Sequence, residues 1–133
     1  MDTNALLAWF VAEVKGSLPT LRDRVFPDFA PEGTKNPCLV YQFVGTENEV
    51  TVDGGAAKDG TLAFQVRIYA GTRKEANALR DSFRERFEGI CPRSIGGGQR
   101  IEGSAWGDLA DTFERETMDF GALGVVEFHL AGG

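Results

Sequence analysis

Hydrophobic residues recur every three or four positions in a segment near the start of the chain, about 4–15. This spacing places the apolar side chains on one face of a helix. Thr3 or Asn4 can cap the start of that helix, and Gly16 followed by Pro19 can end it. The apolar positions are Leu6, Leu7, Phe10, Val11 and Val14, and Trp9 widens the face. So wide a face on a short helix must pack on a sheet or on a neighbouring molecule.

A second helical pattern covers 73–88 and has its own start and stop signals. Thr72 and Glu75 have the spacing of a capping box, in which side chains satisfy the free amides of the first turn. Gly89 can end the helix, and Pro92 prevents it from resuming. The buried stripe of this helix is predicted to be Ala76, Leu79, Phe83, Phe87 and Ile90.

The remaining patterns predict β-strands within 38–70 and 100–130. The clearest strand is 61–70, where apolar and polar residues alternate. The run 39–44 is apolar on both faces, which predicts a central strand covered on both sides. We predict a long loop over 46–60, because glycine and acidic residues dominate it, and within it a short second strand over 49–53 before Gly54-Gly55. The later strands are predicted at about 100–106, 112–118 and 125–130.

The segment 17–37 contains four prolines, which disfavour both helix and central strand. We therefore predict an ordered connection that is pinned by Val25, Phe26 and Phe29. The order helix, strands, helix, strands predicts an α+β fold, in which an N-terminal helix and a central helix pack on a mainly antiparallel β-sheet. At 133 residues the chain is expected to form a single domain over 1–133.

Composition and charge reduce the number of possible partner classes. The net charge of −6 makes specific nucleic-acid binding unexpected, because such binding depends on Lys and Arg neutralising phosphates. The longest apolar run, 5–12, is too short to span a bilayer, so no membrane partner is expected. Cys38 and Cys91 are not in CxxC spacing. Both are predicted to be buried thiols in a reducing compartment, and a disulfide between them stays open.

Catalytic and metal-binding motifs are absent from the sequence. His129 is the single histidine, so HExxH zinc sites and histidine clusters are excluded. The glycine run 96–98 lacks the Lys-Ser/Thr ending of a phosphate loop. The acidic residues of 46–60 do not have the spacing of a calcium loop. We therefore expect no enzyme activity, no metal and no cofactor.

Two surfaces are candidates for contacts with other molecules. The first is the predicted loop 46–60, as a recognition arm; the alternative is a solvated loop. The second is one flank of the second helix, where arginines recur beside the apolar stripe and could pair with acids of an adjacent subunit. The alternative is a solvated flank, with Asp81 and Glu88 as local partners of Arg84. The candidate interface residues are Glu47, Glu49, Asp53, Lys58, Arg73, Arg80, Arg84 and Trp9. For both Trp9 and Trp106, core packing is the prediction and anchoring of an interface is the alternative.

The succession of short patterns from Arg24 to Ile90 carries a resemblance. It runs from Arg24-Val25-Phe26-Pro27 through the Pro-rich segment 30–37 to the hydrophobic run 38–43, and then to the loop, the alternating strand and the capped helix. In that order it resembles the tail completion proteins (tail terminator or tail-to-head joining proteins) of long-tailed bacteriophages and prophages. The resemblance covers about half of the chain, and after Ile90 strands can be placed but no patterns matched.

The resemblance implies a structural virion protein that assembles into a ring, most often a hexamer. Such a ring caps the head-proximal end of the tail, stops tube polymerisation and joins the tail to the head connector. The implied partners are further copies of the chain, the tail tube protein and head–tail connector proteins. The implied location is the neck-proximal end of the virion tail, after assembly in the host cytoplasm. The alternatives are another neck or minor tail protein and, from a different class, a small α+β enzyme or ligand-binding domain with a site beside the second helix.

Overall fold

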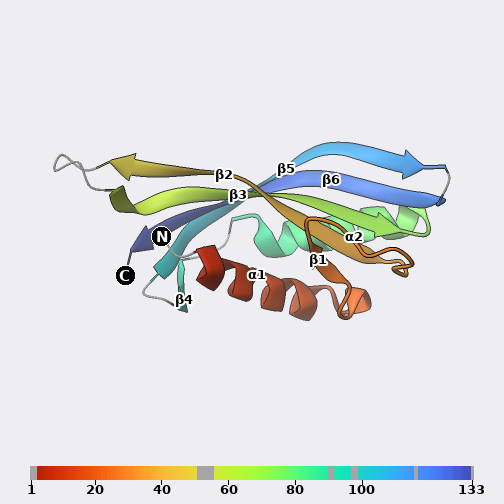
Figure 1. Cartoon of the computed structure of the whole chain (residues 1–133), viewed down its shortest axis with the longest axis horizontal. Coiled ribbons are helices and arrows are strands. Elements are labelled where there is room, and N and C mark those ends of the chain that lie inside the picture. The colour runs from red at the N-terminus through yellow and green to blue at the C-terminus, as the bar shows by residue number, and fades with distance from the viewer. Residues whose placement is uncertain (1–2, 51–55, 90–91, 97–98, 116, 133) are drawn as a thin grey trace.

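The computed structural model describes residues 3–50, 56–89, 92–96, 99–115 and 117–132. In this part of the chain, two α-helices and one 3-10 turn accompany a six-stranded sheet (Figure 1). The elements are α1 (Thr3–Ser17), η1 (Pro19–Leu21), β1 (Val25–Pro27), β2 (Cys38–Val50), β3 (Ala56–Ala70), α2 (Arg73–Phe87), β4 (Arg93–Gly96), β5 (Gln99–Glu114) and β6 (Asp119–Gly132).

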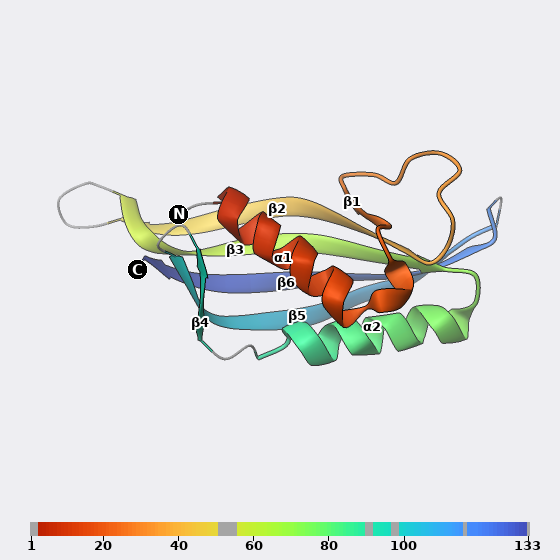
Figure 2. The ribbon, with the colours of Figure 1, turned by 90° about the horizontal axis from the view of Figure 1, so that it is seen from below.

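The strands lie in the order β1-β2-β3-β6-β5-β4. All neighbours are antiparallel except β1 and β2, which are parallel. Seen from below, both helices lie on the same face of the sheet (Figure 2). The α+β fold with a mainly antiparallel sheet is therefore confirmed. We call the face away from the helices the open face.

Both predicted helices are present, with local capping as expected. The Thr72 hydroxyl accepts a hydrogen bond from Glu75 N at 3.1 Å, which satisfies one free amide of the first turn of α2. Gly89 follows the helix with φ +66°, a left-handed conformation that favours glycine. Arg86 of α2 also donates a hydrogen bond to Glu13 of α1, with Nε 2.9 Å from Oε2, so a partly buried ion pair links the two helices.

A cluster of aromatic rings forms the centre of the core. Phe10 of α1 stacks on Phe64 of β3, with ring centroids 5.6 Å apart. The same ring lies 5.3 Å from Phe87 of α2 and 5.9 Å from Phe128 of β6. Four of the five residues predicted for the stripe of α2 are buried, namely Ala76, Leu79, Phe83 and Phe87. The fifth, Ile90, lies outside the described residues.

The predicted loop 46–60 is wrong for most of its length. β2 continues to Val50 and β3 begins at Ala56, and the ladder pairs Thr46 with Leu62 and Val50 with Ala56. Only 51–55 remain between the two strands, outside the described residues. Low β-propensity is overridden here because the ladder extends from a firmly buried section, and bulges absorb the irregular residues. The hairpin 46–60 extends beyond the helices at one end of the molecule (Figure 1).

The expectation that the strand over 39–44 is covered on both sides holds only for its first part. Leu39 and Val40 are buried, whereas Phe43 is 46% exposed and Val44 is 50% exposed. β1 pairs with the edge of β2 only as far as Tyr41, so beyond Tyr41 no described strand lies at that edge either. The apolar run therefore identified a strand correctly and misjudged its cover.

The C-terminal half contains two long strands where three were predicted. The predicted strand 112–118 is the end of β5 followed by a tight turn, in which Met118 has φ +58°. The short edge strands β1 and β4 were missed, since three or four residues give no periodic signal. In the Pro-rich connection, Val25 is buried as predicted, but Phe29 is 72% exposed and does not pin the segment.

Phe83→Ala tests the helix–sheet core. Phe83 is fully buried, 4.5 Å from the Phe87 ring and 5.0 Å from the Trp106 ring. We expect the free energy of unfolding, measured by denaturant titration, to fall by about 3–5 kcal/mol, because the substitution leaves a cavity. Phe29→Ala is the matched control and should have little effect. An unchanged stability of Phe83→Ala would contradict the packing of α2.

Candidate functional site

The arginines of the predicted interface flank face acidic residues of the same chain. Arg80 Nη1 lies 2.6 Å from Asp111 Oδ1, and Arg80 Nε lies 3.9 Å from Asp108 Oδ1. Arg84 Nη1 lies 3.4 Å from Asp108 Oδ2, and its Nη2 lies 3.2 Å from Asp81 Oδ1. We call these residues of α2 and β5 the arginine–aspartate cluster; they join the helix to the outer part of the sheet.

Arg73 belongs to the same flank and is bound at the start of α2. Its Nη1 donates to the Gly121 carbonyl at 2.9 Å and its Nη2 donates to the Thr112 carbonyl at 2.7 Å. The guanidinium also lies 5.4 Å from the centre of the Phe120 ring. A Cβ on Gly121 would come within 2.1 Å of the Thr112 hydroxyl, so only glycine allows this close approach of β5 and β6. Arg73 therefore fixes the ends of these two strands against α2.

Sequence reasoning missed the acidic half of the cluster because a bulge creates it. In a regular strand, residues three apart point to opposite faces. The register shift between Asp108 and Ala110 inserts one residue, and both Asp108 and Asp111 then face α2. The spacing of residues in the sequence does not predict where such a bulge occurs. Of the local partners proposed for Arg84, Asp81 is in contact.

The remaining candidate interface residues lie apart from this cluster. Glu47 and Glu49 are in β2 and Lys58 is in β3, on the hairpin 46–60, while Asp53 lies outside the described residues. Trp9 is half-buried in α1, in edge-on contact with Phe87 at 6.1 Å and Phe128 at 5.7 Å. Core packing is therefore the role that the structure gives Trp9.

Trp106 also packs in the core. It is buried, and its Nε1 donates to Asp108 Oδ1 at 2.7 Å. A Cβ on Gly124 would lie 2.2 Å from the indole ring, so this glycine leaves room for the tryptophan. Asp108 thus bonds both a core indole and the arginines of α2, which positions its carboxylate.

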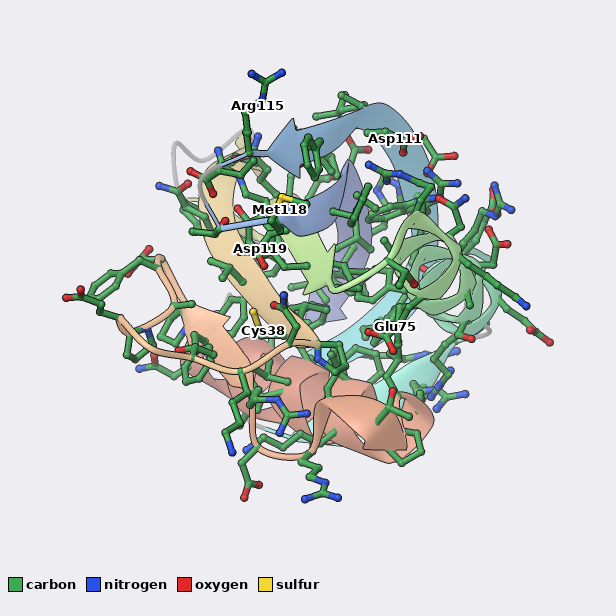
Figure 3. The ribbon with its side chains drawn as sticks, turned by 90° about the vertical axis from the view of Figure 1, so that its right-hand side faces the viewer. Cys38, Glu75, Asp111, Arg115, Met118 and Asp119 are labelled. Atoms are coloured by element: carbon green, nitrogen blue, oxygen red, sulfur yellow. The ribbon has the colours of Figure 1, made fainter. Side chains whose placement is uncertain are left out.

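A pocket of about 580 Å³ lies on the open face, between the segment 28–36 and the β5–β6 turn. Figure 3 looks at this end of the molecule and labels Cys38, Met118 and Asp119 there. The lining includes four carboxyl groups and one cation: Asp28, Glu32, Glu114, Asp119 and Arg67. Asn36 donates a hydrogen bond to Asp119, which ties the segment 28–36 to β6.

Cys38, at the wall of this pocket, is a buried thiol, as predicted; Cys91 lies outside the described residues. Burial, assisted by the Asp119 carboxylate and opposed by Arg24, raises the pKa of the Cys38 thiol from its ordinary 9.0 to about 11. The thiol is therefore protonated at neutral pH and is a weak nucleophile. Burial and the nearby Asp28 also raise the pKa of the Tyr41 phenol.

The space beside α2, where the alternative enzyme reading placed its site, holds a pocket of about 370 Å³ lined by Ser17, Ser82, Glu85 and Arg86. His129 is exposed, and its Nδ1 lies 3.0 Å from the Thr61 hydroxyl. Among the described residues, no group of three or more His, Cys, Asp or Glu could hold a metal ion. No helix in the described part of the chain is long and apolar enough to cross a membrane.

Comparison with known proteins defines the class. The fold is similar to a chain from the virion of a native gene transfer agent particle, with a TM-score of 0.59 and 14% sequence identity. The similarity covers 98% of this chain and 100% of that chain, so it spans the whole fold. No curated protein sequence gives a significant match.

The chain belongs to the family described as tail completion protein gp17, whose model matches residues 4–123. The protein is therefore a structural protein of a phage tail. The resemblance inferred from the sequence is confirmed, and it is wider than the patterns between Arg24 and Ile90 suggested. The match continues through β5 and into β6, where no patterns could be matched.

Arg80→Glu tests the arginine–aspartate cluster. The new carboxylate would face Asp108 and Asp111, and the Arg80 side chain is only 20% exposed, so solvent screens this repulsion incompletely. We expect the free energy of unfolding to fall by about 1–3 kcal/mol, and the double variant Arg80→Glu/Asp111→Arg to recover part of it. Arg115→Glu, in the exposed β5–β6 turn, is the control. Equal stability of Arg80→Glu and the control would contradict the pairing within the chain.

Cys38 gives a pH dependence with a defined sign. Because its pKa is higher in the folded chain than the ordinary 9.0, folding favours the neutral thiol, and this contribution to stability is complete below pH 9. It is lost as the pH rises from 9 toward 11. Denaturant titrations at several pH values should show a smaller alkaline loss for Cys38→Ala than for the parent, both carrying Cys91→Ser. The same slope in both would contradict the burial of the thiol; Tyr41, whose pKa is also raised, contributes equally to both.

Proposed function

We propose that this protein caps the head-proximal end of a long phage tail, stops polymerisation of the tail tube and provides the joint to the head connector. The observation that carries the proposal is the family match over 4–123, because its description names tail completion. The fold similarity to a chain of a phage-like virion supports the same setting. The protein would act at the neck-proximal end of the virion, after assembly in the host cytoplasm.

The proposed task needs complementarity and no chemistry. A cap must match the last tube subunit on one face and offer the next tube subunit no matching face on the other. The molecule suits this requirement because the two ends of its long sheet differ. One end is the paired hairpin 46–60, and the other combines the segment 28–36 with the β5–β6 turn (Figure 1). Exposed Phe29 and Met118 lie at the second end.

We further propose that the functional unit is a closed hexameric ring of this chain, with the tube protein on one face and connector proteins on the other. The hairpin, with Glu47, Glu49, Asp53 and Lys58, is the proposed contact with one of these partners. Of the arginines proposed for subunit contacts, Arg73 and Arg80 are bound within the chain, whereas Arg84 is 42% exposed and can also face a neighbour.

Two alternatives remain distinct. Another neck or minor tail protein would share the family and the fold but occupy a different position in the virion. A ligand-binding domain or a small enzyme is favoured only by the pocket of about 580 Å³, whose volume is in the range of small-molecule sites. A thermal-shift screen with metabolites would support that alternative through saturable stabilisation.

Electron microscopy of purified tails tests the proposal. We expect tails from the parent phage to end in a ring that a tagged copy of this chain labels at the head-proximal end. Lysates lacking the gene should contain tubes of uncontrolled length or tails that do not join heads, and a plasmid copy should restore them. Label at another position in the neck or tail would favour the first alternative. Particles without the chain would contradict both.

A further inference from the structure

The long strand β2 has a backbone edge that is only partly used. β1 pairs with Leu39, Val40 and Tyr41, and no described strand pairs with the outer side of β2 beyond Tyr41. The free edge of β2 is thus the stretch 42–50. Two large apolar side chains at its start, Phe43 and Val44, are half exposed. An exposed edge with apolar side chains is a template for pairing with another strand.

The opposite margin of the sheet has a second such stretch. β4 pairs with β5 only over Gln99–Ile101. The Ser104 carbonyl accepts a bond from Gly89 N at 3.0 Å, and further along β5 the Arg73 guanidinium lies across the paired carbonyls of Thr112 and Gly121. Between these two contacts, over 105–111, no described backbone group pairs with the outer side of β5. This stretch is the free edge of β5, and it carries Leu109, which is 57% exposed.

We infer that the free edge of β2 in one copy pairs with the free edge of β5 in the next copy, so that the ring is held by a continuous β-sheet. This inference rests on the proposed ring and specifies how its subunits join. Strand addition satisfies the free backbone groups of both edges and covers the exposed apolar side chains at the same time. The partner is therefore a second copy of this chain.

Strand direction favours this pairing. The order β2, β3, β6, β5 is antiparallel at each step, so β2 and β5 run in opposite directions across the sheet. A second copy in the same orientation, placed beside the first, brings its β2 antiparallel to β5. Rotation about one axis is then sufficient, and no copy must be inverted. Such a head-to-tail contact is the kind that generates rings.

The offset between the two edges fits a closed ring. One row across the sheet joins Thr46, Leu62, Phe128 and Ser104. The free edge of β2 is centred on Thr46, whereas the free edge of β5 is centred on Asp108, four residues beyond Ser104. To match the two centres, a neighbouring copy must therefore slide along the strands by about four residues. At about 3.3 Å per residue and about 4.8 Å between strands, this slide over four strands corresponds to a strand tilt of about 35°. Closed β-barrels have strands tilted by about 35–45°.

The same offset decides which face lies outside. In Figure 2, seen from the helix side, β2 lies along one margin, β5 lies nearer the other, and the hairpin 46–60 points to the left. Because of the slide, the copy whose β5 pairs with this β2 is displaced toward the end of the sheet that carries the hairpin. With α1 and α2 outside, the strands then coil in the right-handed sense that their twist favours. The inference therefore places the open face toward the ring axis. Bulges in both free edges supply the curvature that closure needs.

Charged substitutions on each edge test the inference. Val44→Lys and Leu109→Lys place an ammonium group where the neighbouring strand would pair, as natural edge strands do to block association. Both side chains are at least half exposed, so we expect unchanged melting temperatures and at least a tenfold loss of tails that carry a ring. Ala12→Lys is the matched control, since Ala12 is exposed on α1, which lies over one face of the sheet and not at either edge. It should leave ring formation unchanged.

Cysteine pairs provide a readout that does not depend on loss of function. With Thr46 set against Asp108, Val44 lies beside Ala110 of the next copy. Assembled tails with Val44→Cys and Ala110→Cys should give a ladder of linked chains on non-reducing gels after oxidation, and each single variant should not. The inference would be overturned if both lysine variants formed normal rings and no ladder appeared, either for this pair or for Val44→Cys with Leu109→Cys. That result would leave the proposed function intact. Tails without this chain would overturn the proposed function instead.

Discussion

Burial of a single face of the sheet under two helices is the constraint on which the rest of this structure depends. The Phe10 ring contacts aromatic side chains from β3, β6 and α2, so one residue of α1 touches three separate parts of the chain. Because both helices lie on that face, the other face and both margins of the sheet are left for other uses. The pocket, the exposed edges and the projecting hairpin all lie in the part that the helices do not cover.

Electrostatic contacts then set where α2 lies along the sheet. The hydrophobic stripe of α2 fixes which side faces inward, but apolar contacts allow sliding. Arg73 at the first turn and Arg80 and Arg84 further along bind fixed groups on β5 and β6, which defines the position. These ion pairs are partly exposed, and each contributes little to stability, but as positioning contacts they keep the outer strands in register with the helix.

The sequence predicted the helices and the central strand well because these elements have strong periodic signals. The Thr72 cap, the stripe of α2 and the alternation over 61–70 are local properties, and each agrees with the structure. The hairpin 46–60 was misjudged because its pairing comes from continuation of a distant ladder and not from its own residues. Asp108 and Asp111 were missed because a bulge decides which way they point. The family was recognised from the order of short patterns, although interface residues cannot be deduced from that order.

The bulge at Leu109 also marks a place where the length of this chain can vary among relatives. Removing one residue between Asp108 and Asp111 would leave the two carboxylates two positions apart, and a regular strand places such residues on the same face. Both carboxylates would still face α2, and Trp106 and Phe113 would keep their faces, so the deletion would remove only the local bend. Away from the bulges of β5, a single insertion or deletion would turn every side chain on one side of it to the opposite face. In an alignment of relatives, single-residue differences in the length of β5 should therefore fall at its bulges, while the number of residues from Ser104 to Asp108 stays constant.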